Sequence, residues 1–114
     1  MNSLSKIQLI ILCGGRGKRL GELTKKLPKP MLKFGEDTFL DILIRYYTNL
    51  GVKNIILSAG YKSEIIKKYY GSLEFKKKFK GIKILVLEEK KLLGTAGAIK
   101  FAQSYVSSNP FLVI

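Results

Sequence analysis

A turn rich in glycine and positive charge follows the first apolar run of the sequence. It holds these glycines and basic residues: Gly14, Gly15, Arg16, Gly17, Lys18 and Arg19. Glycines directly after a strand let the oxygen atoms of a ligand approach the backbone closely, and successive N–H groups in such a loop form a concave nest for an anion. The pattern indicates a phosphate site, although a glycine-rich turn whose charges are only solvated would have the same composition.

Two familiar phosphate-binding loops do not fit this turn. A Walker loop requires a glycine, four residues, and then Gly-Lys-Ser/Thr, whereas here Arg19 follows Lys18 and Leu12 occupies the position of the first glycine. A dinucleotide-binding fingerprint that starts at Gly15 would need its third glycine where Leu20 stands. The turn therefore indicates a different class of phosphate-binding protein.

A lysine between two prolines is a second candidate for anion binding. Pro28 and Pro30 flank Lys29, and each proline fixes its own φ and restricts the residue before it. A lysine held in this way is a fixed point charge, which suits a phosphate oxygen in a transition state.

The composition limits the class of protein. The chain has 114 residues, a formal net charge of +13, no histidine and a single cysteine, Cys13. This length fits one domain, and the charge attracts polyanions without choosing between nucleic acid, nucleotide and membrane. The lack of histidine removes the commonest general base and metal ligand. A lone cysteine, and an apolar run at 7–13 too short to span a bilayer, predict a cytoplasmic protein without a membrane segment.

Apolar runs of strand length alternate with stretches of helical period, which is typical of βαβ units. Strands are predicted at 7–13, 54–58, 82–87 and 111–114, and helices at 38–50, 63–70 and 95–105. Thr38 with Asp41 resembles a capping box, and Thr95 is the expected N-cap of the last helix. The fold class predicted is α/β, with a Rossmann-like parallel sheet covered by helices on both faces.

Three segments together carry a resemblance to a known family. GGRGKRL at 14–20, PKPML at 28–32 and LGTAGAI at 93–99 resemble the signature motifs of the sugar-1-phosphate nucleotidyltransferases. The similarity is greatest to the D-glycero-D-manno-heptose 1-phosphate guanylyltransferase branch, with mannose-1-phosphate guanylyltransferases next. It implies the nucleotidyltransferase fold, truncated after the fourth strand, with residues 1–114 as the N-terminal nucleotide-binding part of a single domain.

The resemblance also implies a reaction and a set of residues. An oxygen of a sugar 1-phosphate would attack the α-phosphorus of GTP and release pyrophosphate, giving a GDP-sugar for surface polysaccharide biosynthesis. Arg19 and Lys29 would be catalytic, and Glu89 would accept both N–H donors of guanine. The nucleotide-binding residues implied are Leu12, Gly14, Gly15, Arg16, Gly17, Glu89, Gly94 and Thr95. Mg²⁺ would be the cofactor, with its main aspartate ligand beyond residue 114 and no metal ligand within the chain.

Other interpretations of the same residues remain open at this point. The charge would also suit a nucleic-acid-binding module with weak, salt-sensitive binding, and a relative that has lost catalysis would keep the motifs. FKKKFK at 75–80 fits either a basic patch or a short charged face with two inward phenylalanines. Glu88 and Glu89 could be solvated acids that end a strand, and Cys13 is expected as a small buried side chain. An open edge at the fourth strand would favour a homo-oligomer.

Overall fold

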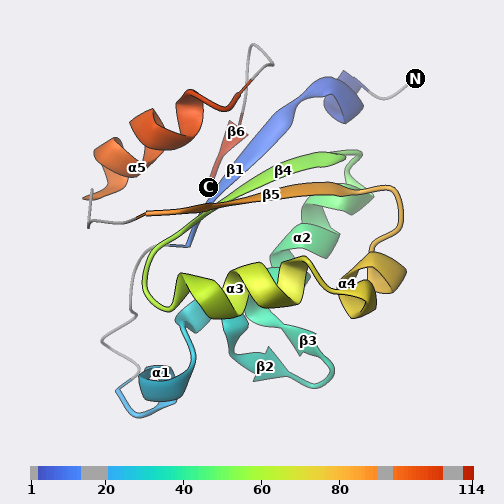
Figure 1. Ribbon diagram of the computed structural model, residues 1–114. Helices are drawn as coiled ribbons and strands as arrows, with labels where there is room; N and C mark the ends of the chain where they lie inside the picture. The colour runs from blue at the N-terminus through green and yellow to red at the C-terminus, as the bar shows by residue number, and fades with distance from the viewer. Residues whose placement is uncertain (1–2, 14–20, 90–93, 107–111) are drawn as a thin grey trace.

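Four parallel strands form the central sheet of the computed structural model, which describes residues 3–13, 21–89, 94–106 and 112–114. Its strands, in the spatial order β5-β4-β1-β6, are Lys83–Glu88, Asn54–Ala59, Gln8–Cys13 and Leu112–Val113. Each neighbouring pair is parallel, so the strands end at one edge of the sheet (Figure 1). In an open parallel sheet, the crevice beyond this edge is where ligands bind.

Helices cover both faces of this sheet. On one face lie α2 (Phe39–Asn49), α3 (Ser63–Tyr70) and α4 (Leu73–Lys78), while α5 (Gly94–Gln103) lies on the other (Figure 1). A large apolar core fills the space between the sheet and the helices α2, α3 and α4. A smaller cluster, made of Ile10, Ile56, Leu87 and Ala102, packs between the sheet and α5. Both faces of the strands are therefore apolar, as buried parallel strands require.

Short elements connect β1 to α2 near the edge where the strands end. A single turn of helix, α1 (Leu23–Lys26), precedes the 3-10 turn η3 (Lys29–Met31), and an antiparallel hairpin follows, formed by β2 (Lys33–Phe34) and β3 (Asp37–Thr38). Gly35 turns this hairpin with a φ of +71°, a backbone conformation that favours glycine. At the start of the chain, η1 (Ser3–Lys6) leads into β1. The described residues contain no helix of the length and apolarity that crossing a membrane requires.

Most of the predicted elements are confirmed, and the differences have local causes. The helix predicted at 38–50 is α2, and its capping box is present because Thr38 accepts from the Asp41 N–H while Asp41 accepts from the Thr38 N–H. The predicted N-cap at Thr95 is wrong, since α5 already begins at Gly94. FKKKFK is the short charged face with inward phenylalanines, because Phe75 and Phe79 are buried in the core.

A buried carboxylate joins the three helices on one face. Asp41, with no exposed surface, accepts hydrogen bonds from the Tyr69 and Tyr70 hydroxyls, both at 3.0 Å, and from the Lys78 ammonium at 3.3 Å. Burial, more than the neighbouring Asp41 charge, raises the pKa of Tyr70, so its hydroxyl stays a donor. The network fixes α3 and α4 against the first turn of α2, the helix that packs against η3.

Candidate functional site

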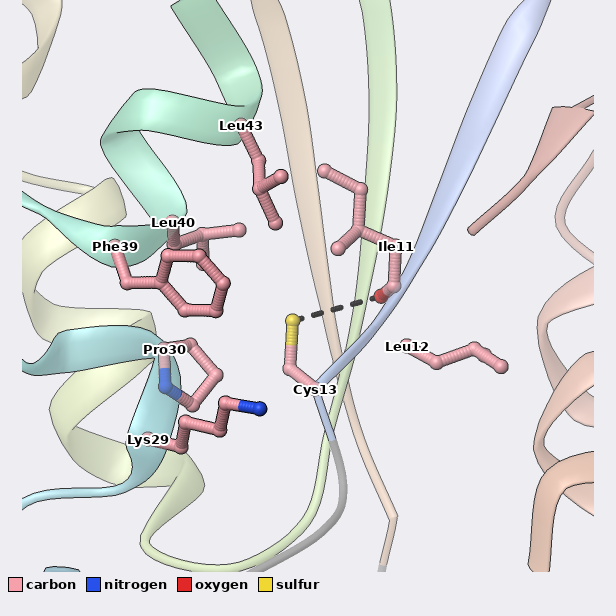
Figure 2. Close-up of a pocket in the computed structure, with 8 residues that line it drawn as sticks. All are labelled: Ile11, Leu12, Cys13, Lys29, Pro30, Phe39, Leu40 and Leu43. Atoms are coloured by element: carbon pink, nitrogen blue, oxygen red, sulfur yellow. Dashed lines mark hydrogen bonds between the residues drawn. The ribbon is translucent and has the colours of Figure 1, made fainter. Parts of the chain in front are cut away.

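A pocket of about 310 Å³ lies at the carboxyl end of β1. Its walls come from β1, from η3 and from the first turns of α2 (Figure 2). The residues that line it are Ile11, Leu12, Cys13, Lys29, Pro30, Phe39, Leu40 and Leu43. Most of these side chains are apolar, so the Lys29 ammonium is the charged group that this part of the chain brings to the pocket.

Lys29 is held in a stiff turn, as its flanking prolines predict. Pro28 precedes η3 in an extended conformation, and its carbonyl accepts from the Met31 N–H at 2.9 Å. The Lys29 side chain is exposed, and its Nζ lies 5.6 Å from the centroid of the Phe39 ring. Figure 2 shows the ammonium pointing toward the end of β1. The turn therefore presents a positive charge beside the strand end without an acidic partner in the described ion pairs.

Cys13 closes the inner wall of the pocket. Its side chain is 2% exposed, and the thiol donates a weak hydrogen bond to the Ile11 carbonyl at 3.5 Å. Burial, with a smaller contribution from the Glu89 carboxylate, raises the pKa of the Cys13 thiol to about 12. The thiol is thus kept neutral, which agrees with a packing role and not with that of a nucleophile.

The raised pKa predicts that native Cys13 resists alkylation. A shift from 9.0 to about 12 lowers the thiolate fraction at neutral pH by about a thousandfold, and burial limits access further. Iodoacetamide at pH 8 should leave Cys13 unmodified in the folded protein and modify it completely in denaturant, as measured by mass spectrometry. Rapid alkylation of the folded protein would contradict the buried, neutral thiol.

Two neighbouring glutamates at the end of β5 face opposite sides of the sheet. Glu88 turns toward α3, where its carboxylate accepts from the Ser63 hydroxyl at 2.8 Å and from the Lys67 ammonium at 3.1 Å. Glu89 follows on the alternate side, as successive side chains of an extended strand do, and accepts from the Ser58 hydroxyl at 2.9 Å. Both acids are partly buried and hydrogen-bonded, so neither is simply a solvated acid.

Glu89 continues the sheet beyond the last residue of β5. Its backbone N–H donates to the carbonyl of Ala59 at 2.7 Å, which fixes the Cα position beside the end of β4. The side chain lies on the face that α5 covers, together with Leu12 and Ser58, which are register partners on β1 and β4. Figure 2 likewise shows Leu12 pointing away from Cys13, to the other side of β1. Two predicted nucleotide-binding residues therefore share one face of the sheet.

Ser58 is the member of this group that the sequence did not single out. It is fully buried near the end of an apolar strand, and a lone serine in such a run carries no motif. The only signal was its position as the last residue of a predicted strand. In three dimensions its hydroxyl meets the carboxylate of Glu89, 31 residues later in the chain.

Several predicted residues lie outside the described part of the chain. The glycine-rich turn, with Gly14, Gly15, Arg16, Gly17 and Arg19, falls in the undescribed segment 14–20.

The other two predicted nucleotide-binding residues, Gly94 and Thr95, begin α5, at the sheet edge where the strands end (Figure 1). Among the described residues, no group of three or more acidic, histidine or cysteine side chains could hold a metal ion.

Comparison with known proteins shows which family shares this sheet edge. Residues 8–114 match the family described as nucleotidyl transferase, a match that includes all four strands and the pocket. The chain belongs to the nucleotidyl transferase family. This agrees with the fold class predicted from the sequence and with the resemblance carried by its three motifs.

Relatives of this nucleotidyl transferase chain include enzymes named for guanylyl transfer. It is 42% identical over 107 residues to D-glycero-alpha-D-manno-heptose 1-phosphate guanylyltransferase of Campylobacter jejuni, covering 94% of this chain and 46% of the relative. It is 37% identical to mannose-1-phosphate guanyltransferase of Neurospora crassa, covering 95% of this chain and 29% of the relative. The crystal structure of HddC from Yersinia pseudotuberculosis complexed with GMP-PN has a TM-score of 0.80 at 36% identity, covering 95% of this chain and 46% of that one.

The nucleotidyl transferase chain spans less than half the length of each of these relatives. Within that span the fold is shared, since the solved HddC structure superposes on nearly the whole chain.

Proposed function

We propose that the full-length protein transfers GMP from GTP to a sugar 1-phosphate and releases pyrophosphate. The preferred acceptor is D-glycero-D-manno-heptose 1-phosphate, and the product is a GDP-sugar for surface polysaccharide synthesis. One observation carries the proposal: the Glu89 carboxylate and the Lys29 ammonium both lie at the edge where the strands end, on opposite sides of the sheet. The names of its relatives support the choice of reaction.

The arrangement suggests how a nucleotide lies on the sheet edge. With its base at Glu89 and its phosphates near Lys29, the nucleotide passes over the end of β1. Gly14, Gly15 and Gly17 follow this strand directly in the sequence, and their N–H groups can approach the phosphates closely. In this proposal residues 1–114 form the nucleotide-binding part of a single domain.

A carboxylate at Glu89 suits guanine better than the other bases. Guanine presents two adjacent donors, N1–H and N2–H, and a carboxylate that accepts both leaves a buried charge unpaired when another base occupies the site. GTP is therefore the preferred donor. Leu12, on the same face as Glu89, and the α5 residues Gly94 and Thr95 complete the base site in this proposal.

The chemistry of transfer requires charge compensation and not a general base. The attacking oxygen of a sugar 1-phosphate is already an anion, so the chain needs no histidine for the reaction. In-line attack brings phosphates of two substrates together, and fixed cations lower the energy of that transition state. Lys29 holds the reacting phosphates, Arg19 holds the departing pyrophosphate, and Arg16 assists it.

A divalent metal is expected for this family of reactions, and we propose Mg²⁺. The carboxylates described at the sheet edge do not provide a site for it, because Glu88 pairs with Lys67 and Glu89 faces Ser58. The main ligand would come from beyond residue 114. The reaction would take place in the cytoplasm, where the nucleotide and the sugar phosphate are available.

A turnover assay with the full-length protein tests the proposal. Pyrophosphate release should be fastest with GTP and D-glycero-D-manno-heptose 1-phosphate, slower with mannose 1-phosphate, and close to background with ATP, CTP, UTP or dTTP. Faster turnover with mannose 1-phosphate would replace the acceptor and keep the reaction. No release with GTP and either sugar phosphate, in a protein that is folded, would contradict the proposed activity.

A further inference from the structure

The environment of Ser58 is unusual for a serine in the middle of a parallel sheet. Its side chain has no exposed surface, and the residues around it on β4 are apolar. A hydroxyl buried in this way is costly unless it is hydrogen-bonded. Its Oγ donates to Oε1 of Glu89 at 2.9 Å, and this carboxylate is the one that we propose as the guanine acceptor.

The geometry leaves most of the Glu89 carboxylate available to a ligand. Ser58 reaches it from within the sheet, and the backbone N–H of Glu89 is already used by the Ala59 carbonyl. The main chain and one carboxylate oxygen are thus both held, and the hydrogen bonds among the described residues leave the second oxygen without a partner. A carboxylate has about four lone-pair sites, so the bond from Ser58 leaves room for two further donors.

We infer that Ser58 is the positioning residue for base recognition: its buried hydroxyl fixes the Glu89 carboxylate in the orientation that accepts N1–H and N2–H of guanine. This inference rests on the proposed function. A free glutamate would lose rotamer freedom on binding the base, whereas a carboxylate that is already held loses less. Ser58 therefore affects the affinity for guanine more than the affinity for other bases, without touching the nucleotide.

A second serine supplies a matched control. The hydroxyl of Ser63 donates to Glu88 at 2.8 Å, which is the same kind of bond to the adjacent acid, on the opposite face of the sheet. Ser63→Ala and Ser58→Ala remove equivalent groups, but only Ser58 supports the carboxylate on the side of Leu12 and α5. A merely structural role for the Ser58 bond would weaken the binding of GTP and ATP alike.

The experiment measures the dissociation constants of GTP and ATP for the full-length protein and its variants by calorimetry. Ser58→Ala should weaken GTP about tenfold, as expected for a bond to a charged group, and leave the affinity for ATP nearly unchanged. Ser63→Ala should change neither constant. In the Glu89→Ala background, where GTP preference is lost, Ser58→Ala should have no further effect on the ratio of the two constants.

The variants separate failure of the inference from failure of the proposed function. If Glu89→Ala loses the preference for GTP but Ser58→Ala keeps it, or if Ser58→Ala weakens GTP and ATP equally, the positioning role is overturned and base recognition by Glu89 stands. If the wild-type protein has no preference for GTP, or if Glu89→Ala retains it, base recognition itself is overturned, and the role of Ser58 with it. The ATP constant also reports a folding defect, because such a defect would weaken both nucleotides.

Discussion

Replacing Lys29 by methionine should lower kcat of the full-length protein by about 100- to 1000-fold, the cost of removing a preorganised charge from a phosphoryl-transfer site. Methionine keeps much of the aliphatic stem and removes the ammonium. The effect should fall mainly on kcat, because in the proposed site the charge is positioned at the reacting phosphates while GTP would keep its contact with Glu89. Steady-state pyrophosphate release with GTP and the sugar 1-phosphate measures both kcat and KM.

A lysine in the adjacent hairpin is the control for Lys29. Lys33 is exposed on β2, carries the same charge, and does not line the pocket. Lys33→Met should leave kcat within about twofold of wild type, because substitutions at exposed positions outside a functional site usually have small effects. Equal losses in the two variants would indicate that only net charge matters and would remove Lys29 from the proposed site.

Replacing Asp41 by alanine should cause the largest loss of stability among the substitutions considered. The change leaves the hydroxyls of Tyr69 and Tyr70 and the ammonium of Lys78 without their shared acceptor in the core. A buried donor left unsatisfied costs about 1–3 kcal/mol, and two tyrosine hydroxyls lose their acceptor here, while Lys78 keeps its ion pair with Asp37 at 3.2 Å. The midpoint of urea-induced unfolding, followed by circular dichroism, should therefore fall markedly.

Two further variants show whether this loss belongs to the buried network. Tyr70→Phe removes one hydroxyl from Asp41 and should cost about 1 kcal/mol. Glu64→Ala removes an exposed acid of α3 and should change the free energy of unfolding by less than about 0.5 kcal/mol. A midpoint for Asp41→Ala close to that for Glu64→Ala would contradict the stabilising role of the network.

The parallel sheet was predictable because its strands are continuous apolar runs separated by amphipathic helices. The elements between β1 and α2 were not predicted, since a hairpin with two-residue strands is too short for a hydrophobic period to appear. Gly35 was a usable signal, because a glycine between Phe34 and two acids is typical of a tight turn. The N-cap at Thr95 failed because helix ends are set by backbone geometry that residue preference indicates only to within one or two positions.

The candidate site was predictable to the extent that it depends on local sequence. The prolines beside Lys29 and the position of Glu89 after a strand could be identified from the chain alone. The contact between Ser58 and Glu89 could not, because it depends on the register of β4 against β5 and on which face each side chain occupies. The same holds for Asp41, whose capping role is local but whose bonds to α3 and α4 are not.

We propose that this sheet edge binds a guanine nucleotide specifically and does not only attract anions through the net charge of +13. Titration of the full-length protein with GTP, ATP, CTP, UTP and dTTP, each with Mg²⁺ and at low and high salt, tests it most directly. We expect GTP to bind most tightly, with a preference that persists at high salt. Equal binding of all five nucleotides that disappears at high salt would contradict the account and leave only a basic surface.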